Sequence, residues 1–112
     1  MSSLKTKFWV DALIRRAESG LAAAYVIRRG DEDAGAVLLK VVDGDRLAHL
    51  YVPVRDENGE RLWTLFRDAP VPEPDADAYC RGRVDDDPDL WLIEIEDRAG
   101  RHFLTEPVEA DG

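Results

Sequence analysis

The sequence has few of the residues that build disulfides and metal sites. Cys80 is the only cysteine among 112 residues, so an internal disulfide is impossible. A single cysteine is typical of a reducing compartment, and we expect a cytoplasmic protein. His49 and His102 are the only histidines. Because a structural zinc site needs about four Cys or His ligands in closely spaced pairs, we expect no metal site of this kind.

Long apolar runs are also missing. No segment approaches the roughly 18 apolar residues that a membrane span requires. The first twenty residues carry charges on both sides of their apolar positions and lack a small-residue cleavage site. They are typical of an amphipathic helix rather than of a signal peptide. We therefore expect no membrane partner.

The sequence contains enough apolar material for one core. Hydrophobic residues make up 45% of the chain and charged residues 35%, which excludes a disordered chain. This length corresponds to one compact domain over residues 1–112. We expect an ordered core at about 4–106 and a frayed, polar tail at 107–112.

Charge is unevenly distributed along the chain. The net charge is −9, yet residues 1–30 carry six basic and two acidic side chains, and the rest carries nine basic and 22 acidic ones. The acidic bulk repels nucleic acid, so we expect no nucleic-acid partner. The basic end could bind an anion or complement the acidic part of the same fold.

Apolar periodicity predicts two helices and six strands. An apolar helical stripe over 7–19 comprises Trp9, Val10, Leu13, Ile14 and Ala17. Strands are expected at 21–29, 35–42, 46–54, 61–66, 89–96 and 101–104, with a short helix at about 74–83. Asp43-Gly44 and Asn58-Gly59 are typical of hairpin turns. The order α-β-β-β-β-α-β-β predicts an α+β domain with a largely antiparallel sheet of about five or six strands. The amphipathic N-terminal helix and the second short helix pack against this sheet.

Three stretches of the chain carry a resemblance to a known family: LKTKFWVDALIRRAE, RRGDEDAGAVLLK and DPDLWLIEIEDRAGRHFL. Together they resemble the small alphaproteobacterial family of unknown function DUF1491, over about residues 4–107. The resemblance implies a bacterial, cytoplasmic protein with one α+β domain. It implies no activity, cofactor or catalytic residue.

Two acidic segments resemble ion-binding loops. The run at 85–89 contains Pro88 and no glycine, whereas a calcium loop needs a glycine for its sharp turn. It is more typical of a helix end followed by a strand. The turn that contains Asp31 and Asp33 lacks the Lys and Ser/Thr of a phosphate-binding loop. We expect no cofactor, although a weak divalent-cation site at this turn stays open.

Glu94 and Glu96 are candidates for acid/base chemistry. In the strand at 89–96 they lie on the same side, about 7 Å apart, where two carboxylates can share a proton or hold a metal. If residues 97–100 form a turn, Glu96 lies opposite Arg101 and pairs with it across the strands. A small acid/base or metal-dependent enzyme, helped by Asp31 or Asp33, is the alternative function.

The favoured function uses an aromatic and basic surface near the N-terminal helix. Trp9, Trp63 and Trp91 all lie on apolar faces, so core packing is their default role; Trp9 is the one best placed to line a surface. The basic residues close to it in sequence are Arg15, Arg16, Arg28 and Arg29. We expect a non-catalytic binding or regulatory module for an unknown protein or a small anionic ligand. Cys80 is expected to be a small buried residue, and a homodimer through a sheet edge or the helix stripe stays open.

Overall fold

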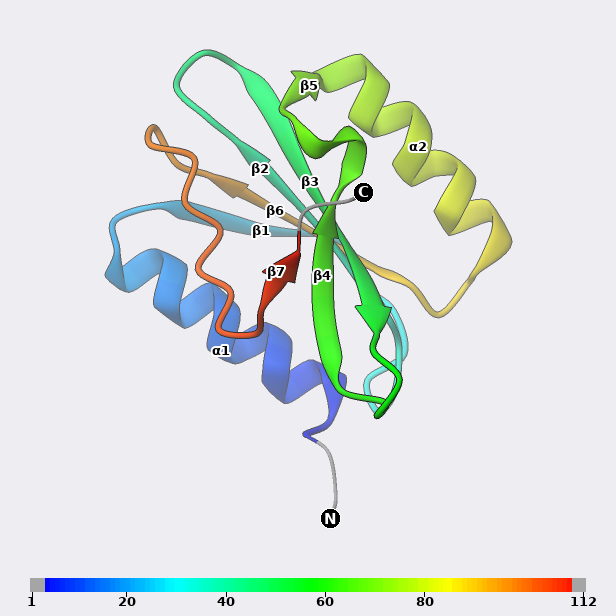
Figure 1. Cartoon of the computed structure of the whole chain (residues 1–112). Helices are drawn as coiled ribbons and strands as arrows, with labels where there is room; N and C mark the ends of the chain where they lie inside the picture. Colours follow the sequence, from blue (N-terminus) through cyan, green and yellow to red (C-terminus); the bar gives the residue numbers. More distant parts are fainter. Residues whose placement is uncertain (1–3, 110–112) are drawn as a thin grey trace.

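The computed structural model describes residues 4–109, which form two helices, a 3-10 turn and seven strands (Figure 1). In chain order the elements are α1 (Thr6–Ser19), β1 (Ala23–Arg28), β2 (Val37–Val42), β3 (Leu47–Arg55), β4 (Arg61–Leu65), η1 (Phe66–Asp68), β5 (Val71–Pro72), α2 (Glu73–Asp86), β6 (Trp91–Glu96) and β7 (Val108–Glu109). Neither helix in this part of the chain is long and apolar enough to cross a membrane.

All seven strands belong to one sheet. Its order is β1-β6-β2-β3-β4-β7, and the short β5 pairs with β3. Four of the pairings are antiparallel, whereas β2–β6 and β4–β7 are parallel. The α+β fold with a largely antiparallel sheet is therefore confirmed, and the sheet is mixed because β6 returns from α2 and inserts between β1 and β2.

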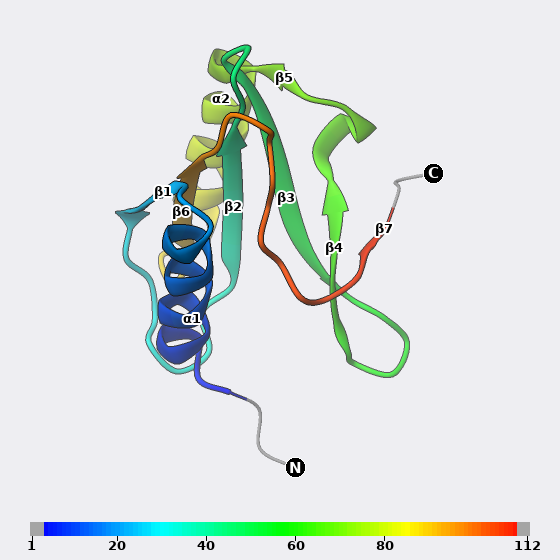
Figure 2. The same ribbon diagram turned by 90° about the vertical axis from the view of Figure 1, so that its left-hand side faces the viewer.

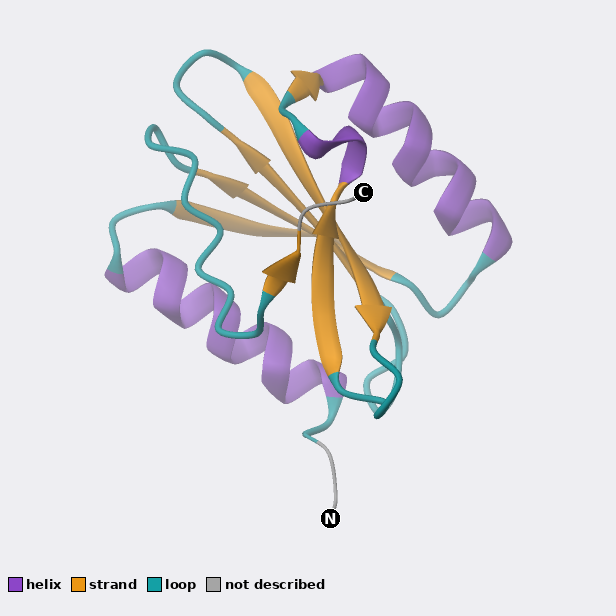
Figure 3. Ribbon diagram, viewed as in Figure 1, coloured by secondary structure: helices purple, strands orange, loops and turns teal. Residues whose placement is uncertain are grey.

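The two helices cover opposite faces of this sheet, and their axes are visible on either side of it in Figure 3. The expected stripe of α1 is buried: Trp9, Val10, Leu13 and Ala17 pack against β2, β4 and β6. Burial of one such leucine stabilises a fold by about 1.5–3 kcal/mol. The Thr6 hydroxyl also donates to the Gly35 carbonyl at 2.8 Å, which fixes the start of α1 against the loop before β2.

The face beneath α2 is smaller and includes a buried lysine. Ala76 and Cys80 of α2 pack on Leu38 and Leu50. Lys40 follows on the same face of β2 and is only 5% exposed. Its ammonium lies within 3.2 Å of three carboxylates, those of Glu73, Asp77 and Glu94. A buried charge is tolerated where it is paired in this way.

The end of the chain differs from the expected arrangement. Residues 101–104 do not form a strand, because β1 and β2 already occupy both edges of β6. Arg101 instead bonds to Asp97 and to the Gly20 carbonyl, and Glu96 pairs with Arg46 at 3.6 Å. The expected cross-strand pair of Glu96 and Arg101 was therefore wrong. Val108 and Glu109 form β7 beside β4, within the stretch expected to fray, and residues 110–112 lie outside the described part of the chain.

The sheet opens between β2 and β3 (Figure 2). The β2–β3 ladder ends at the pair Leu39–Tyr51, and β3 then runs away from β2 while it stays paired with β4. Two residues further along the ladder, Val37 would face Pro53. Proline has no backbone N–H to donate to a neighbouring strand, which explains why the strands separate at this point. We call the opening the β2–β3 wedge.

Candidate functional site

A tight hairpin turn places two arginines opposite each other. The Asp56 carboxylate accepts backbone N–H groups of Asn58 and Glu60 at 2.8 and 2.9 Å. Gly59 takes a φ of 78°, a conformation that glycine adopts without strain. The turn therefore closes so that Arg55, at the end of β3, and Arg61, at the start of β4, are direct cross-strand partners.

This arginine pair has no ion-pair partner among residues 4–109. Neither guanidinium lies within 4.0 Å of a carboxylate oxygen in this part of the chain. Arg55 donates one hydrogen bond to the Gly59 carbonyl at 3.0 Å. Like charges that face each other directly across strands destabilise a sheet. The pair is therefore costly unless something negative lies between or beside the two side chains.

Arg61 is partly buried against an aromatic cluster. Its guanidinium carbon lies 5.1 Å from the ring centre of Trp9, and Trp9 stacks on Trp63 with ring centres 5.5 Å apart. Burial and the charge of Arg55 lower the pKa of Arg61, and the charge of Glu106 opposes that shift. The group stays positive at neutral pH and is half-buried, so part of its surface is withdrawn from water.

Glu106 holds the aromatic cluster in place. Its two oxygens accept the indole N–H groups of Trp9 at 2.9 Å and of Trp63 at 3.3 Å. Burial alone would raise the pKa of Glu106, but the two indole donors and the charge of Arg61 hold it below its usual value. Glu106 is therefore ionised at neutral pH with both oxygens engaged, which fixes the Trp9 ring above β4.

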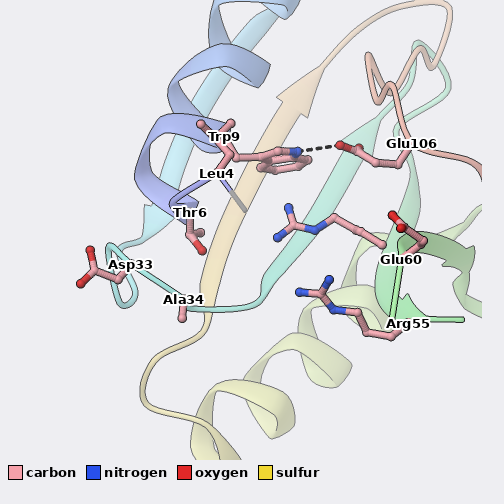
Figure 4. Close-up of a pocket in the computed structure, with 9 residues that line it drawn as sticks. Leu4, Thr6, Trp9, Asp33, Ala34, Arg55, Glu60 and Glu106 are labelled. Carbon is pink, nitrogen blue, oxygen red and sulfur yellow. Dashed lines mark hydrogen bonds between the residues drawn. The ribbon is translucent and has the colours of Figure 1, made fainter. Parts of the chain in front are cut away.

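These side chains line a pocket of about 340 Å³ between the start of α1 and the β3–β4 hairpin. Figure 4 shows the Trp9–Glu106 bond at the top of the pocket and the guanidinium of Arg55 directed toward Ala34. The Asp33 carboxylate, on the rim, points away from Arg55 and lies 3.6 Å from Lys5. We call this cavity the arginine pocket. Its lining combines the guanidiniums of Arg55 and Arg61 and the indole ring of Trp9 with three carboxylate residues, Asp33, Glu60 and Glu106.

Of the five binding residues expected from the sequence, Trp9 alone lines the arginine pocket. Arg15 is exposed on α1, and Arg16 donates to the Phe103 carbonyl at 2.9 Å. Arg28 ends β1, the edge strand of the sheet, and Arg29 follows it, so neither residue lines the arginine pocket. The structure does not bring the four arginines together.

Arg28 and Arg29 are both engaged within the fold. Arg28 donates to the Pro88 carbonyl at 3.0 Å. Arg29 forms an ion pair with Glu32 and lies 5.3 Å from the ring centre of Trp91. Their contacts fasten the loop after β1 to the segment before β6, which is a structural role.

Glu94 and Glu96 each form an ion pair with a different basic side chain. Glu94 lies 3.2 Å from the Lys40 ammonium and lines a pocket of about 500 Å³ between α2 and β6. Glu96 pairs with Arg46 and does not line that pocket. Within residues 4–109, no group of three or more His, Cys, Asp or Glu side chains is arranged to hold a metal ion. Asp31 caps its own turn by accepting the backbone N–H of Ala34.

Cys80 and the histidines lie apart from the arginine pocket. Burial, with a smaller contribution from Asp77, raises the pKa of the Cys80 thiol to about 11, so it is protonated at neutral pH. Cys80 packs beneath α2, whereas His102 contacts Tyr51 in the core beneath α1. His49 bonds to Asp43 at 2.7 Å. A thiolate–imidazole pair is therefore not formed between Cys80 and His102.

Sequence reasoning missed Arg55 and Arg61. The Asn58-Gly59 turn was recognised, and both arginines stand three residues from Asn58 on either side. A five-residue turn centred on Asn58 makes them cross-strand partners. The length of this turn is the signal in the sequence that could have identified Arg55 and Arg61 as a cross-strand pair.

The fold and this site define a small α+β domain that carries an aromatic and basic pocket at one end of its sheet. The chain belongs to the family described as "Protein of unknown function (DUF1491)", whose family model matches residues 4–105. The resemblance seen in the sequence is thereby confirmed. None of the curated proteins compared with the chain matches it.

Solved structures of family members share this fold. A crystal structure of a DUF1491 family protein from Caulobacter crescentus CB15 is 53% identical, with a TM-score of 0.90 over 96% of this chain and 100% of that one. An NMR structure of a DUF1491 family protein from the same organism is 52% identical, with a TM-score of 0.88 over 97% and 99%. The solution structure of protein Atu0922 from A. tumefaciens is 30% identical, with a TM-score of 0.79 over 94% and 95%.

Proposed function

We propose that this protein is a non-catalytic binding module that takes a small anion in the arginine pocket, between Arg55 and Arg61. The observation that supports this most directly is the cross-strand pairing of these two arginines without a carboxylate partner in the described chain. The protein carries a net charge of −9, so internal carboxylates are abundant. Arg55 and Arg61 nevertheless face each other without an internal carboxylate as ion-pair partner, so their guanidiniums are suited to bind an external anion.

The chemistry of the pocket favours a carboxylate or phosphate group. A guanidinium presents parallel N–H donors that match two oxygens of such a group, and these charge-assisted bonds are roughly twice as strong as neutral ones. A bound anion would also cancel the repulsion between Arg55 and Arg61. Trp9 adds a flat apolar wall for the remainder of the ligand, which makes it the one residue shared by the sequence-based and structure-based sites.

We place this function in the cytoplasm of a bacterium. The single, buried Cys80 suits a reducing compartment, and the related solved structures come from bacteria. The acidic surface would repel anions at long range, so recognition depends on the local field of the arginine pocket. A regulatory role follows if the anion is a metabolite whose concentration varies.

A thermal-shift titration with sodium phosphate tests the proposal. Ionic strength is held constant with sodium chloride, and the general stabilisation by phosphate, which is excluded from protein surfaces, is common to wild type and the variants. A ligand at 100 times its Kd stabilises the folded state by about 2.7 kcal/mol. We expect wild type to gain stability, and Arg55→Gln and Arg61→Gln to lose most of that gain.

Arg98→Gln is the matched control, because Arg98 is exposed in the turn after β6, away from the arginine pocket. It removes the same charge and should leave the phosphate effect unchanged. An equal gain in wild type, Arg55→Gln and Arg61→Gln would contradict the proposed function.

A further inference from the structure

The arginine pocket continues into the β2–β3 wedge. A second cavity, of about 270 Å³, shares Ala34, Arg55 and Arg61 with the first. The rest of its lining comes from residues 35–37 at the start of β2, from Pro53 and Val54 on β3, from Trp63 on β4 and from Arg83 on α2. The strands have separated here (Figure 2), and the lining of the cavity includes Arg83 of α2. The site therefore extends from the α1 face of the sheet into the gap between its strands.

Arg83 stands at the α2 end of this cavity. Its guanidinium donates to the Tyr79 hydroxyl at 2.9 Å and lies 5.8 Å from the Tyr79 ring centre. It has no carboxylate within ion-pair distance among residues 4–109. The contact with Tyr79 holds the side chain in place and leaves other guanidinium donors for a ligand.

The wedge cavity is lined by three guanidiniums and by no carboxylate. Arg55 and Arg61 reach it from the side of Trp63, which packs beneath α1, whereas Arg83 belongs to α2 on the other face of the sheet. Apolar walls separate the two ends, formed by Ala36, Val37 and Pro53 among others. This arrangement suits two separate anionic groups, one at each end of the cavity.

We propose that the ligand of this protein is a dianion with two anionic groups joined by a short apolar spacer. One group binds Arg55 and Arg61, the spacer crosses the wedge past Pro53, and the other group binds Arg83. This inference rests on the proposed function, because it assigns the second half of the same site. The volume of the wedge cavity, about 270 Å³, is just below the roughly 300–1,000 Å³ of drug-sized ligand sites, which limits the ligand to a small organic acid or a phosphorylated one.

Calorimetric titration with straight-chain dicarboxylates tests the inference. Succinate, glutarate and adipate differ only in spacer length, and the monomethyl ester of each removes one charge at nearly constant shape. We expect one chain length to bind wild type best, and to bind about tenfold more tightly than its own ester, which corresponds to about 1.4 kcal/mol. Equal binding of the dicarboxylates and their esters to wild type would overturn the inference without any variant.

The variants separate the two ends of the site. Arg83→Gln should reduce the advantage of the dicarboxylate over its ester to within about twofold, while the ester still binds. Arg83→Lys keeps the charge and should retain most of the advantage, which excludes loss of folding as the cause. Arg81→Gln, on the exposed side of the same helix, is the matched control and should change nothing.

The results distinguish failure of the dianion inference from failure of the proposed function. If Arg83→Gln leaves dicarboxylate binding unchanged while Arg55→Gln abolishes it, the dianion inference is wrong and the proposed function stands. If wild type binds neither the dicarboxylates, nor their esters, nor inorganic phosphate, both are wrong.

Discussion

Arg55 and Arg61 face each other directly across the β3–β4 hairpin, and no carboxylate oxygen among residues 4–109 lies within 4.0 Å of either guanidinium. Three other arginines of the chain are neutralised within the fold. Arg101 bonds to Asp97, Arg46 pairs with Glu73, and Arg29 pairs with Glu32. The cross-strand pair is therefore a local electrostatic cost in a protein rich in available acids, and an anion site is the simplest function that explains it.

Replacing Arg55 with glutamate should stabilise the free protein and abolish anion binding. The change turns a repulsive cross-strand pair with Arg61 into an attractive one, and such pairs contribute roughly 0.2–1 kcal/mol. Urea unfolding at low ionic strength measures the effect. Arg98→Glu changes the net charge equally without facing Arg61, so it should not stabilise. A loss of stability in Arg55→Glu equal to that in Arg98→Glu would argue against repulsion in the wild-type pair.

Glu106→Gln should destabilise the protein by about 1–3 kcal/mol, because the indole donors of Trp9 and Trp63 lose a charged acceptor. The pKa of Glu106 is lowered in the folded state. Its contribution is therefore present above its ordinary pKa of 4.5 and is lost as pH falls through the lower pKa of the folded state. Urea unfolding between pH 3 and 7 should show a shallower acid slope for Glu106→Gln than for wild type, because proton uptake by Glu106 contributes to that slope. Identical slopes would contradict the role assigned to Glu106.

Lys40→Met should be severely destabilising. Removal of one member of a buried ionic cluster typically costs about 3–5 kcal/mol, since the remaining carboxylates lose their counter-charge. Burial opposes ionisation of Lys40, but its bonds to Glu73, Asp77 and Glu94 outweigh that effect and raise its pKa. The contribution of Lys40 is thus complete below about pH 10.5 and falls only as pH rises through the still higher folded value.

The measurement for Lys40 is urea unfolding of the wild type and Lys40→Met at several pH values from neutral to mildly alkaline. The difference between them should stay constant over that range. Adding Glu94→Gln to Lys40→Met removes one unneutralised carboxylate and should recover part of the loss. No recovery would indicate that packing rather than charge dominates at this position.

The Cys80 thiol should be inert in the folded protein. It is buried under α2, and burial raises its pKa to about 11, so little reactive thiolate is present at neutral pH. Iodoacetamide labelling at pH 7.5, followed by mass spectrometry, should therefore occur at the rate of global unfolding and become rapid in urea. Fast labelling without denaturant would show that α2 opens locally.

The sequence was sufficient for most local structure, because the signals involved are local. The stripe from Trp9 to Ala17 predicted α1, and the Asp-Gly and Asn-Gly pairs predicted two hairpin turns. The insertion of β6 between β1 and β2 was not predictable in the same way, because the parallel partner of β6 is separated from it by three strands and a helix. That insertion removed the edge that the expected strand at 101–104 would have needed.

In the candidate site, too, the residues set by local sequence signals were predictable and those set by long-range strand pairing were not. Trp9 was recognised because its helical position is set by nearby residues. The arginines closest to it in sequence were expected to join it, whereas the structure brings Arg61 to Trp9 from a strand more than fifty residues away. Proximity in the sequence predicted that Arg15 and Arg16 belong to the site with Trp9. In the structure, the register of the β3–β4 pairing places Arg55 and Arg61 there instead. That register follows from the length of the turn around Asn58, which the Asn58-Gly59 signal alone does not fix.

Arginine side-chain NMR spectra recorded during a phosphate titration test the anion-binding claim most directly. The Nε–Hε resonances report on each guanidinium separately, at constant ionic strength. We expect saturable shifts of the Arg55 and Arg61 resonances with one common dissociation constant, while the Arg98 resonance stays unchanged. Shifts that are absent at both residues, or equal at all three, would contradict an anion site between Arg55 and Arg61.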